Sequence, residues 1–188
     1  MQLLFTRQIQ IGWLLLIVSS LIILPTQWLL TTPATPSGIA DLELAGNVQA
    51  FTDILVLWSN DAEYGNLLWA AHASVWMDFL FLAAYTLLFH GFSVHIAQKL
   101  VNCAGKGVLF NALNRSLSWA AKGFLLAGSC DILENLCLLA ALNGAPSESN
   151  TLGAALFASV KFLALFYGLI LLGAGWVGSR IRGQRAAS

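Results

Sequence analysis

Charged residues are scarce in this sequence of 188 residues, and their scarcity excludes most soluble folds. Asp, Glu, Lys and Arg make up only 10% of the chain, against about 25% in typical globular domains. Cysteine is also rare, with three residues, and no Cys-x-x-Cys pair occurs, which argues against a membrane thiol oxidoreductase. Because 58% of the residues are hydrophobic, the composition predicts an integral membrane protein.

Familiar motifs for catalysis and cofactor binding are missing as well. The sequence has no H-E-x-x-H, no G-x-S-x-G and no phosphate-binding loop. Gly173, Gly175 and Gly178 match G-x-G-x-x-G by letter, but they end an apolar helix, where close helix packing is the better interpretation. His72 and His90 would share a helix face, yet the sequence offers no facing pair of histidines to complete haem ligation. We therefore expect neither a metal nor a cofactor.

Apolar runs long enough to cross a bilayer occur four times. Their approximate bounds are 9–30, 67–90, 117–142 and 152–177. The first run is longer than the core of a signal peptide, so it is expected to remain as a helix. The connections are too short for a separately folded module. We therefore predict an all-α membrane protein in which residues 1–188 form one domain, a bundle of four transmembrane helices.

The first connection is expected to contain an amphipathic helix on the outer membrane surface. Ser37 is a plausible N-cap, and apolar residues then recur at helical spacing as far as Trp58. Trp58, Tyr64 and Trp69 would form an aromatic belt at the interface. A lid over an outward-facing pocket is the alternative role for this segment. On the other side, residues 92–101 could form a second short interfacial helix.

Basic residues gather on one side of the predicted membrane. Apart from Lys161, all of them precede the first span, surround the second connection or follow the last span. The positive-inside rule places these segments in the cytoplasm, whereas the first and third connections carry only acids. We therefore expect a multi-pass membrane protein with both termini cytoplasmic. Its expected partners are membrane lipids, an amine-bearing ligand or a proton, and a second copy of the chain, but not nucleic acid.

Four ionisable residues inside the predicted spans carry the strongest functional signal: Asp78, Asp131, Glu134 and Lys161. A charge in hydrocarbon costs several kcal/mol unless it is paired, neutralised or hydrated, so such residues commonly mark functional sites. Spacings of three and four residues place Asp131 and Glu134 on one helix face together with Asn135. Including a polar stripe on the second span, the candidate ligand- or proton-binding residues are Asp78, Asp131, Glu134, Asn135, Lys161, Tyr85 and Ser74.

Depth can be compared between spans, because neighbouring spans run in opposite directions. Counting from the outer helix ends places Glu134 level with Lys161, and Asp78 level with Asp131. We therefore predict an ion pair between Glu134 and Lys161, and a deeper pair of acids that has no cation of its own. Two carboxyl groups in one dry site cannot both stay ionised, so the acid pair is expected to hold a proton or a cation. His72 is a candidate partner for Glu134 from above.

Three classes of function fit these residues. The preferred one is binding or transport of a cationic or amine-bearing small molecule, a lipid or a proton. The second is a lipid-modifying intramembrane enzyme, in which one carboxyl donates a proton, another accepts it and Lys161 stabilises developing negative charge. The third is a structural or assembly subunit whose buried polar groups fix the register of its helices. Whether the chain is an enzyme stays open, and its catalytic residues are unknown.

In architecture, four spans with intramembrane acids resemble the family that includes the sterol isomerase and sigma-2-type receptor proteins. The resemblance covers the arrangement alone, because the Asp131-x-x-Glu134-Asn135 run cannot be assigned to that family as a motif. Architecture by itself does not transfer function, so no residue role is carried over.

Overall fold

Six helices form the computed structural model, which describes residues 2–102, 108–144 and 146–186 and contains no strand within these ranges. The long helices are α1 (Gln2–Leu30), α4 (Leu68–Asn102), α5 (Val108–Asn143) and α6 (Glu148–Ala186), and the short ones are α2 (Ile39–Glu43) and α3 (Val48–Ser59). Each long helix contains a segment that is long and apolar enough to cross a membrane. The four predicted apolar helices are therefore confirmed.

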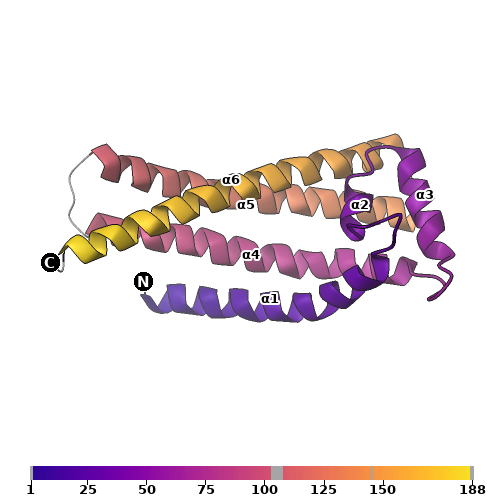
Figure 1. Ribbon diagram of the computed structural model, residues 1–188, viewed down its shortest axis with the longest axis horizontal. Helices are drawn as coiled ribbons and strands as arrows, with labels where there is room; N and C mark the ends of the chain where they lie inside the picture. The colour runs from indigo at the N-terminus through magenta and orange to yellow at the C-terminus, as the bar shows by residue number, and fades with distance from the viewer. Residues whose placement is uncertain (1, 103–107, 145, 187–188) are drawn as a thin grey trace.

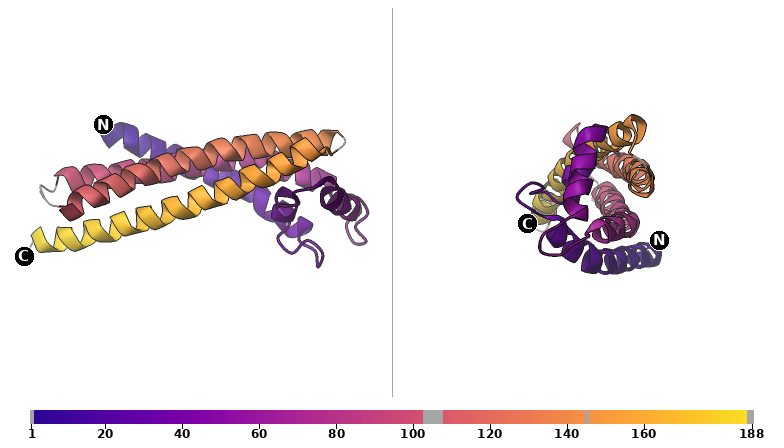
Figure 2. Two further views of the ribbon diagram at one scale, coloured as in Figure 1. Left: turned by 90° about the horizontal axis from the view of Figure 1, so that it is seen from above. Right: turned by 90° about the vertical axis from the view of Figure 1, so that its right-hand side faces the viewer.

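The long helices lie side by side, and both chain ends lie at the same end of the molecule (Figure 1). α5 packs along both α4 and α6, and α4 also touches α6. α1 packs mainly along α4, so it lies on the outside of the group formed by α4, α5 and α6, as the end-on view of Figure 2 shows. The core that positions the site is therefore made by three helices, with α1 as a neighbour.

Small residues allow α5 and α6 to approach closely. Gly168 lies against the ring of Phe124, where an added Cβ would fall 2.9 Å from ring carbons. Ala154 and Ala158, earlier on α6, are fully buried. The predicted small-residue face of the fourth span therefore packs against its neighbour, as expected when helices associate through close backbone contact.

α2 and α3 cover the end of the long helices that lies opposite to the chain termini (Figure 1). The sequence pattern predicted one helix beginning after Ser37, whereas the structure has two helices and places Gly38 at the first N-cap. Gly46 separates them with a φ of 70°, a conformation that glycine adopts without a steric penalty. Asn47 then caps α3, because its side-chain oxygen accepts a hydrogen bond from the backbone N–H of Ala50 at 2.8 Å.

The prediction that Trp58 joins Tyr64 and Trp69 in an aromatic belt is wrong. Its side chain is fully buried with Phe51 where α3 covers the long helices, and its indole N–H donates a hydrogen bond to the hydroxyl oxygen of Thr35 at 3.3 Å. A buried indole is stable when its ring is packed and its N–H has an acceptor, and both conditions are met. Tyr64 and Trp69, the other residues of the predicted belt, are exposed.

Residues 92–101 do not form a separate interfacial helix but continue α4 to Asn102. α4, α5 and α6 contain 35, 36 and 39 residues. At 1.5 Å per residue they are roughly 53 to 59 Å long, well beyond a hydrocarbon core of about 30 Å. Each of these helices is therefore long enough to reach past the membrane as well as across it.

Candidate functional site

The ammonium group of Lys161 meets three carboxylates inside the molecule. Its Nζ lies 3.0 Å from Asp131 Oδ1, 2.7 Å from Glu134 Oε2 and 3.5 Å from Glu43 Oε2. α5 supplies Asp131 and Glu134, α6 supplies Lys161, and Glu43 is the last residue of α2. We use the name charge cluster for these four residues together with three polar neighbours from α4 and α5: Glu43, Asp78, Tyr85, Asp131, Glu134, Asn135 and Lys161.

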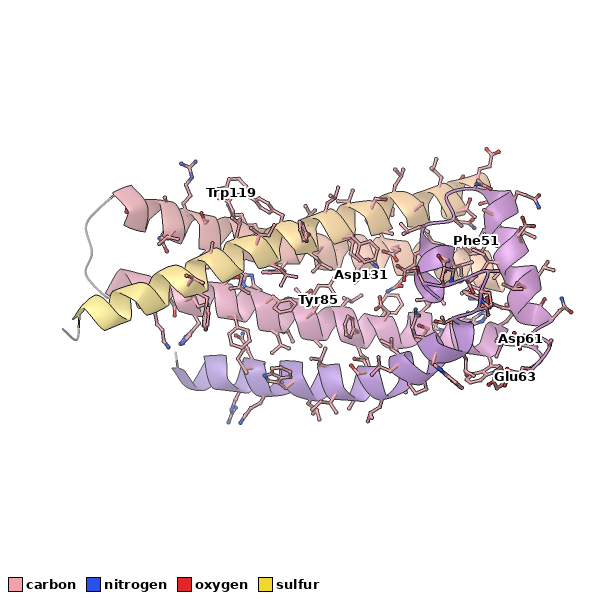
Figure 3. The ribbon with its side chains drawn as sticks, viewed as in Figure 1. Phe51, Asp61, Glu63, Tyr85, Trp119 and Asp131 are labelled. Atoms are coloured by element: carbon pink, nitrogen blue, oxygen red, sulfur yellow. The ribbon has the colours of Figure 1, made fainter. Side chains whose placement is uncertain are left out.

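Two further hydrogen bonds join side chains of α4 to the acids and the amide of α5 in the charge cluster. The hydroxyl of Tyr85 donates to Asp131 Oδ2 at 2.8 Å, and the side chains of these two residues lie between the helices in Figure 3. The side-chain amide of Asn135 donates to Asp78 Oδ2 at 2.7 Å. Since both oxygens of Asp131 are engaged, by Lys161 and by Tyr85, its carboxylate is held in one orientation.

Most of the cluster is closed to water. Glu134 is 0% exposed, Asn135 1% and Asp131 2%, and Lys161 is buried as well. Asp78 differs, because its side chain is only partly buried. Charges removed from water are stable only with close partners and satisfied hydrogen bonds, and the short contacts of Lys161 supply them for Asp131 and Glu134.

Helical spacing and small side chains bring these groups together. Asp131, Glu134 and Asn135 lie on one face of α5, three and four residues apart. One turn before Asp131 on α5, Ala127 is fully buried. On α6, Ala158 is also fully buried and lies three residues before Lys161, where its small side chain permits a close approach of the neighbouring helix.

The ion pair predicted between Glu134 and Lys161 is present, but the prediction of a separate acid pair is wrong. Asp131 shares Lys161 with Glu134, and Asp78 is held by Asn135. The physical reason is that an ammonium group has three donors on a long flexible stem, so one lysine can serve two carboxylates a single helical turn apart.

The expected contact between His72 and Glu134 also needs correction, and Ser74 lies apart from the hydrogen bonds described above. His72 does not reach Glu134, because its Nδ1 lies 2.8 Å from the backbone oxygen of Leu68 and its Nε2 lies 3.3 Å from the side-chain oxygen of Asn143. Ser74 is buried on α4, but within the described ranges no hydrogen bond joins it to the charge cluster. The other predicted site residues lie together in the charge cluster: Asp78, Tyr85, Asp131, Glu134, Asn135 and Lys161.

Glu43 was missed by the sequence argument, which placed it among the acids of the outer connection. Its spacing could have indicated that its side chain is buried, because Glu43 follows Ile39 by four residues and so shares the apolar face of the short helix. Ile39 packs against the main hydrophobic core, and Glu43 is buried beside it on the same side of α2.

The geometry bears on which ions the site could hold. Among the described residues, no group of three His, Cys, Asp or Glu side chains is arranged to hold a metal ion. At the centre of the charge cluster, the position that a cation would take is occupied by the ammonium group of Lys161. The cluster is therefore built around its own cation.

Comparison with known proteins gives no relative. No known protein family, no curated protein and no solved structure matches this chain. The charge cluster is therefore the feature from which its function can be argued.

Proposed function

We propose that this chain is a proton-coupled membrane protein and that the charge cluster is its proton-binding site. One observation carries the proposal: three carboxyl groups, from Glu43, Asp131 and Glu134, contact a single ammonium group, and Asn135 holds a fourth, that of Asp78, in the same cluster. With every group ionised, the cluster would hold three negative charges in excess. A mostly buried site does not tolerate such an excess, so it takes up protons or another cation.

The burial of Glu134 favours a proton over a larger cation. Its side chain has no surface that a water molecule can touch, so an amine-bearing ligand could reach it only by displacing Lys161. A proton needs no cavity and can pass between oxygens that share hydrogen bonds. Asp78 is the least buried carboxyl of the helices in the cluster, and we assign to it the exchange of protons with the surroundings.

The proposal includes the membrane and the orientation of the chain. Four long apolar helices support a multi-pass protein whose helices pack as a bundle, with α1 joined through α4. The two chain ends lie together, and the acid-rich connections lie at the opposite end with α2 and α3 (Figure 1). By the positive-inside rule, we place the termini in the cytoplasm and the charge cluster in the outer half of the bilayer.

The other two classes of function have less support. An intramembrane enzyme needs its acid and base to touch the substrate, whereas Asp131 and Glu134 are closed off by Lys161. A device that only fixes helix register has no need for carboxyl groups in excess over ammonium groups. Proton binding explains both the burial and the imbalance.

Infrared difference spectroscopy between acidic and alkaline pH tests the proposal, because it separates protonated from ionised carboxyl groups. We expect the purified wild-type protein to show a protonated carboxyl at neutral pH, and we expect Asp131→Asn and Glu134→Gln to change that band. Glu148→Gln is the matched control, since Glu148 is an acid at the first residue of α6 and lies outside the cluster. Its spectrum should match the wild type in this region.

Two results would contradict proton binding. Finding every carboxyl of the cluster ionised at neutral pH without a bound cation would remove its physical basis. Native mass spectrometry can give the second result. A small amine that co-purifies with the wild type and is absent from Asp131→Asn would show that the cluster binds an amine ligand rather than a proton.

A further inference from the structure

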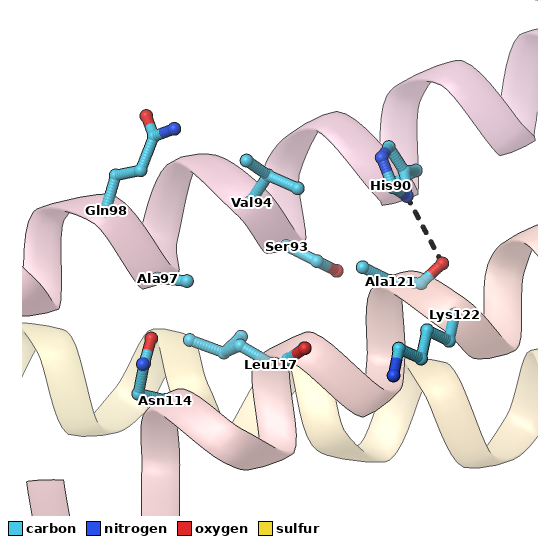
Figure 4. A pocket seen from close by; sticks show the side chains of 10 residues that line it. His90, Ser93, Val94, Ala97, Gln98, Asn114, Leu117, Ala121 and Lys122 are labelled. Atoms are coloured by element: carbon cyan, nitrogen blue, oxygen red, sulfur yellow. Dashed lines mark hydrogen bonds between the residues drawn. The ribbon is translucent and has the colours of Figure 1, made fainter. Parts of the chain in front are cut away.

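A second polar site lies between α4 and α5, on the side of the charge cluster that faces the chain termini (Figure 4). It is a recess of about 610 Å³, for which we use the name inner recess. Its polar lining includes His90 and Ser93 from α4, and Asn114, Ser118 and Lys122 from α5. Of the described residues that line it, none is acidic. The inner recess therefore has the opposite charge character to the cluster.

Both helices place this recess at the same depth. His90 lies 22 residues from the first residue of α4, Leu68, and Lys122 lies 21 residues from the last residue of α5, Asn143. At 1.5 Å per residue, both distances are about 32 Å, which matches the thickness of the hydrocarbon core. If α2 and α3 lie at one membrane surface, the inner recess lies at the other, at the level of the lipid phosphates.

Lys122 gives the inner recess its charge. Its side chain is exposed, and among the described residues no carboxylate pairs with it. Its ammonium lies 5.0 Å from the ring centroid of Trp119, an exposed aromatic residue of the kind found at membrane interfaces. His90 is fixed at the edge of the recess, because its Nδ1 donates a hydrogen bond to the backbone oxygen of Ala121 at 3.2 Å.

An apolar groove of about 590 Å³ is lined by the same lysine. It runs between α5 and α6, from Trp119 and Tyr167 past Lys122 to Leu126 and Leu163, which lie closer to the middle of the helices. Lys122 therefore stands between a polar recess at phosphate level and an apolar groove at the level of acyl chains. A free phosphate ion would use only the first of these, whereas a phospholipid would use both.

We propose that the inner recess and the adjoining groove bind an anionic phospholipid of the leaflet at this end of the molecule. Lys122 contacts the phosphate, the side chains of Asn114 and Ser118 donate hydrogen bonds to the headgroup, and an acyl chain lies along Leu126 and Leu163. The proposal is independent of the charge cluster, because it shares no residue with it.

Native mass spectrometry of the full chain, released from mixed bilayers of phosphatidylglycerol and phosphatidylcholine, tests this site. We expect the wild type to retain phosphatidylglycerol preferentially, and Lys122→Gln to reduce the retained fraction about fivefold, as expected for one basic residue near a membrane surface. Arg115→Gln is the matched control, since Arg115 is another exposed basic residue of α5 and does not line the recess. Lys122→Arg keeps the charge and should restore retention.

Three outcomes would overturn the proposal. The first is a wild type that retains both lipids equally, and the second is an equal loss of phosphatidylglycerol in Lys122→Gln and Arg115→Gln. The third is complete displacement of phosphatidylglycerol by inorganic phosphate, which would assign the recess to the free ion.

Circular dichroism and gel filtration of each variant verify that the compared proteins are folded. Should Lys122→Gln fail to fold, Ser118→Ala takes its place, with the same expected direction.

Discussion

At the scale of single residues, Lys161 is the side chain on which the buried charges depend. Its ammonium group contacts Glu43, Asp131 and Glu134, which come from two different helices. Removing one partner from a buried ion pair leaves an uncompensated charge, which costs far more than the pair itself contributes. The contribution of Lys161 is therefore best measured by substitutions that change the charge balance in both directions.

We expect Lys161→Met to lower the free energy of unfolding by about 3–5 kcal/mol at neutral pH, because three carboxylates lose their common partner. The double variant Lys161→Met/Glu134→Gln removes one of these charges and should recover part of the loss. The loss should also shrink in acid, where the carboxyls carry protons and repel each other less. Denaturation in detergent, monitored by circular dichroism, measures all three effects.

The control for this experiment is Lys99→Met, which removes an exposed lysine near the C-terminal end of α4, outside the charge cluster. It should change the free energy of unfolding by less than about 0.5 kcal/mol, as surface substitutions usually do. Equal stability of Lys161→Met and Lys99→Met would show that the charge cluster does not support the fold.

Much of the cluster could be predicted at this scale because helices have a fixed geometry. The three-and-four spacing of Asp131, Glu134 and Asn135 follows from 3.6 residues per turn, and counting from the helix ends brought Glu134 to Lys161. Glu43 could not be placed in the same way. Its spacing from Ile39 indicates which face of α2 it shares, but its contact with Lys161 depends on how this short helix docks on α6, and packing decides that docking.

At the scale of elements, α5 and α6 are held together where glycines let one helix approach the other. An added Cβ at Gly168 would meet the ring of the buried Phe124, whereas one at Gly173 would meet nothing within 4 Å. The two glycines lie on the same helix, five residues apart, but only one faces its neighbour. They form a matched pair for testing this packing.

We expect Gly168→Leu to separate α5 from α6 locally and to lower the melting temperature, since overpacking a close contact costs about 1–3 kcal/mol. Gly173→Leu should leave the melting temperature near that of the wild type. Differential scanning fluorimetry in detergent compares the two variants, and identical melting temperatures would contradict the packing role assigned to Gly168.

The short helices show where prediction at the element scale fails. Apolar residues at helical spacing indicated one helix, but the pattern cannot show that Gly46 adopts a positive φ and divides it. The break turns α3 so that Trp58 and Phe51 enter the core. A pattern of spacing predicts which face of a helix is apolar, but not what that face will cover.

At the scale of the whole molecule, the two ends differ in charge and in structure. One end carries α2, α3 and the acidic connections, and the other carries the chain termini (Figure 1). The positive-inside rule turns this asymmetry into an orientation that can be measured.

We expect Glu63→Cys to react in intact cells with a maleimide that cannot cross membranes, and Gln184→Cys to react only after permeabilisation. Both variants are made in a background without the three native cysteines, and Glu63 is suitable because its side chain is exposed in the outer connection. The reverse labelling pattern would invert the orientation and place the charge cluster in the cytoplasmic half of the bilayer.

The placement of Lys161 on the helix that directly follows Asp131 and Glu134 also bears on how the protein is made. The three residues belong to consecutive helices, and only residues 144–147 separate α5 from α6. Alone, α5 would enter the membrane with two unpaired acids, and α6 with an unpaired lysine, each at a cost of a few kcal/mol per charge. Inserted together as a helical hairpin, they arrive with two acids and one base already in contact. In the proposed membrane topology, the sequence order of the charges thus favours insertion of α5 and α6 as a pair over insertion of each helix alone.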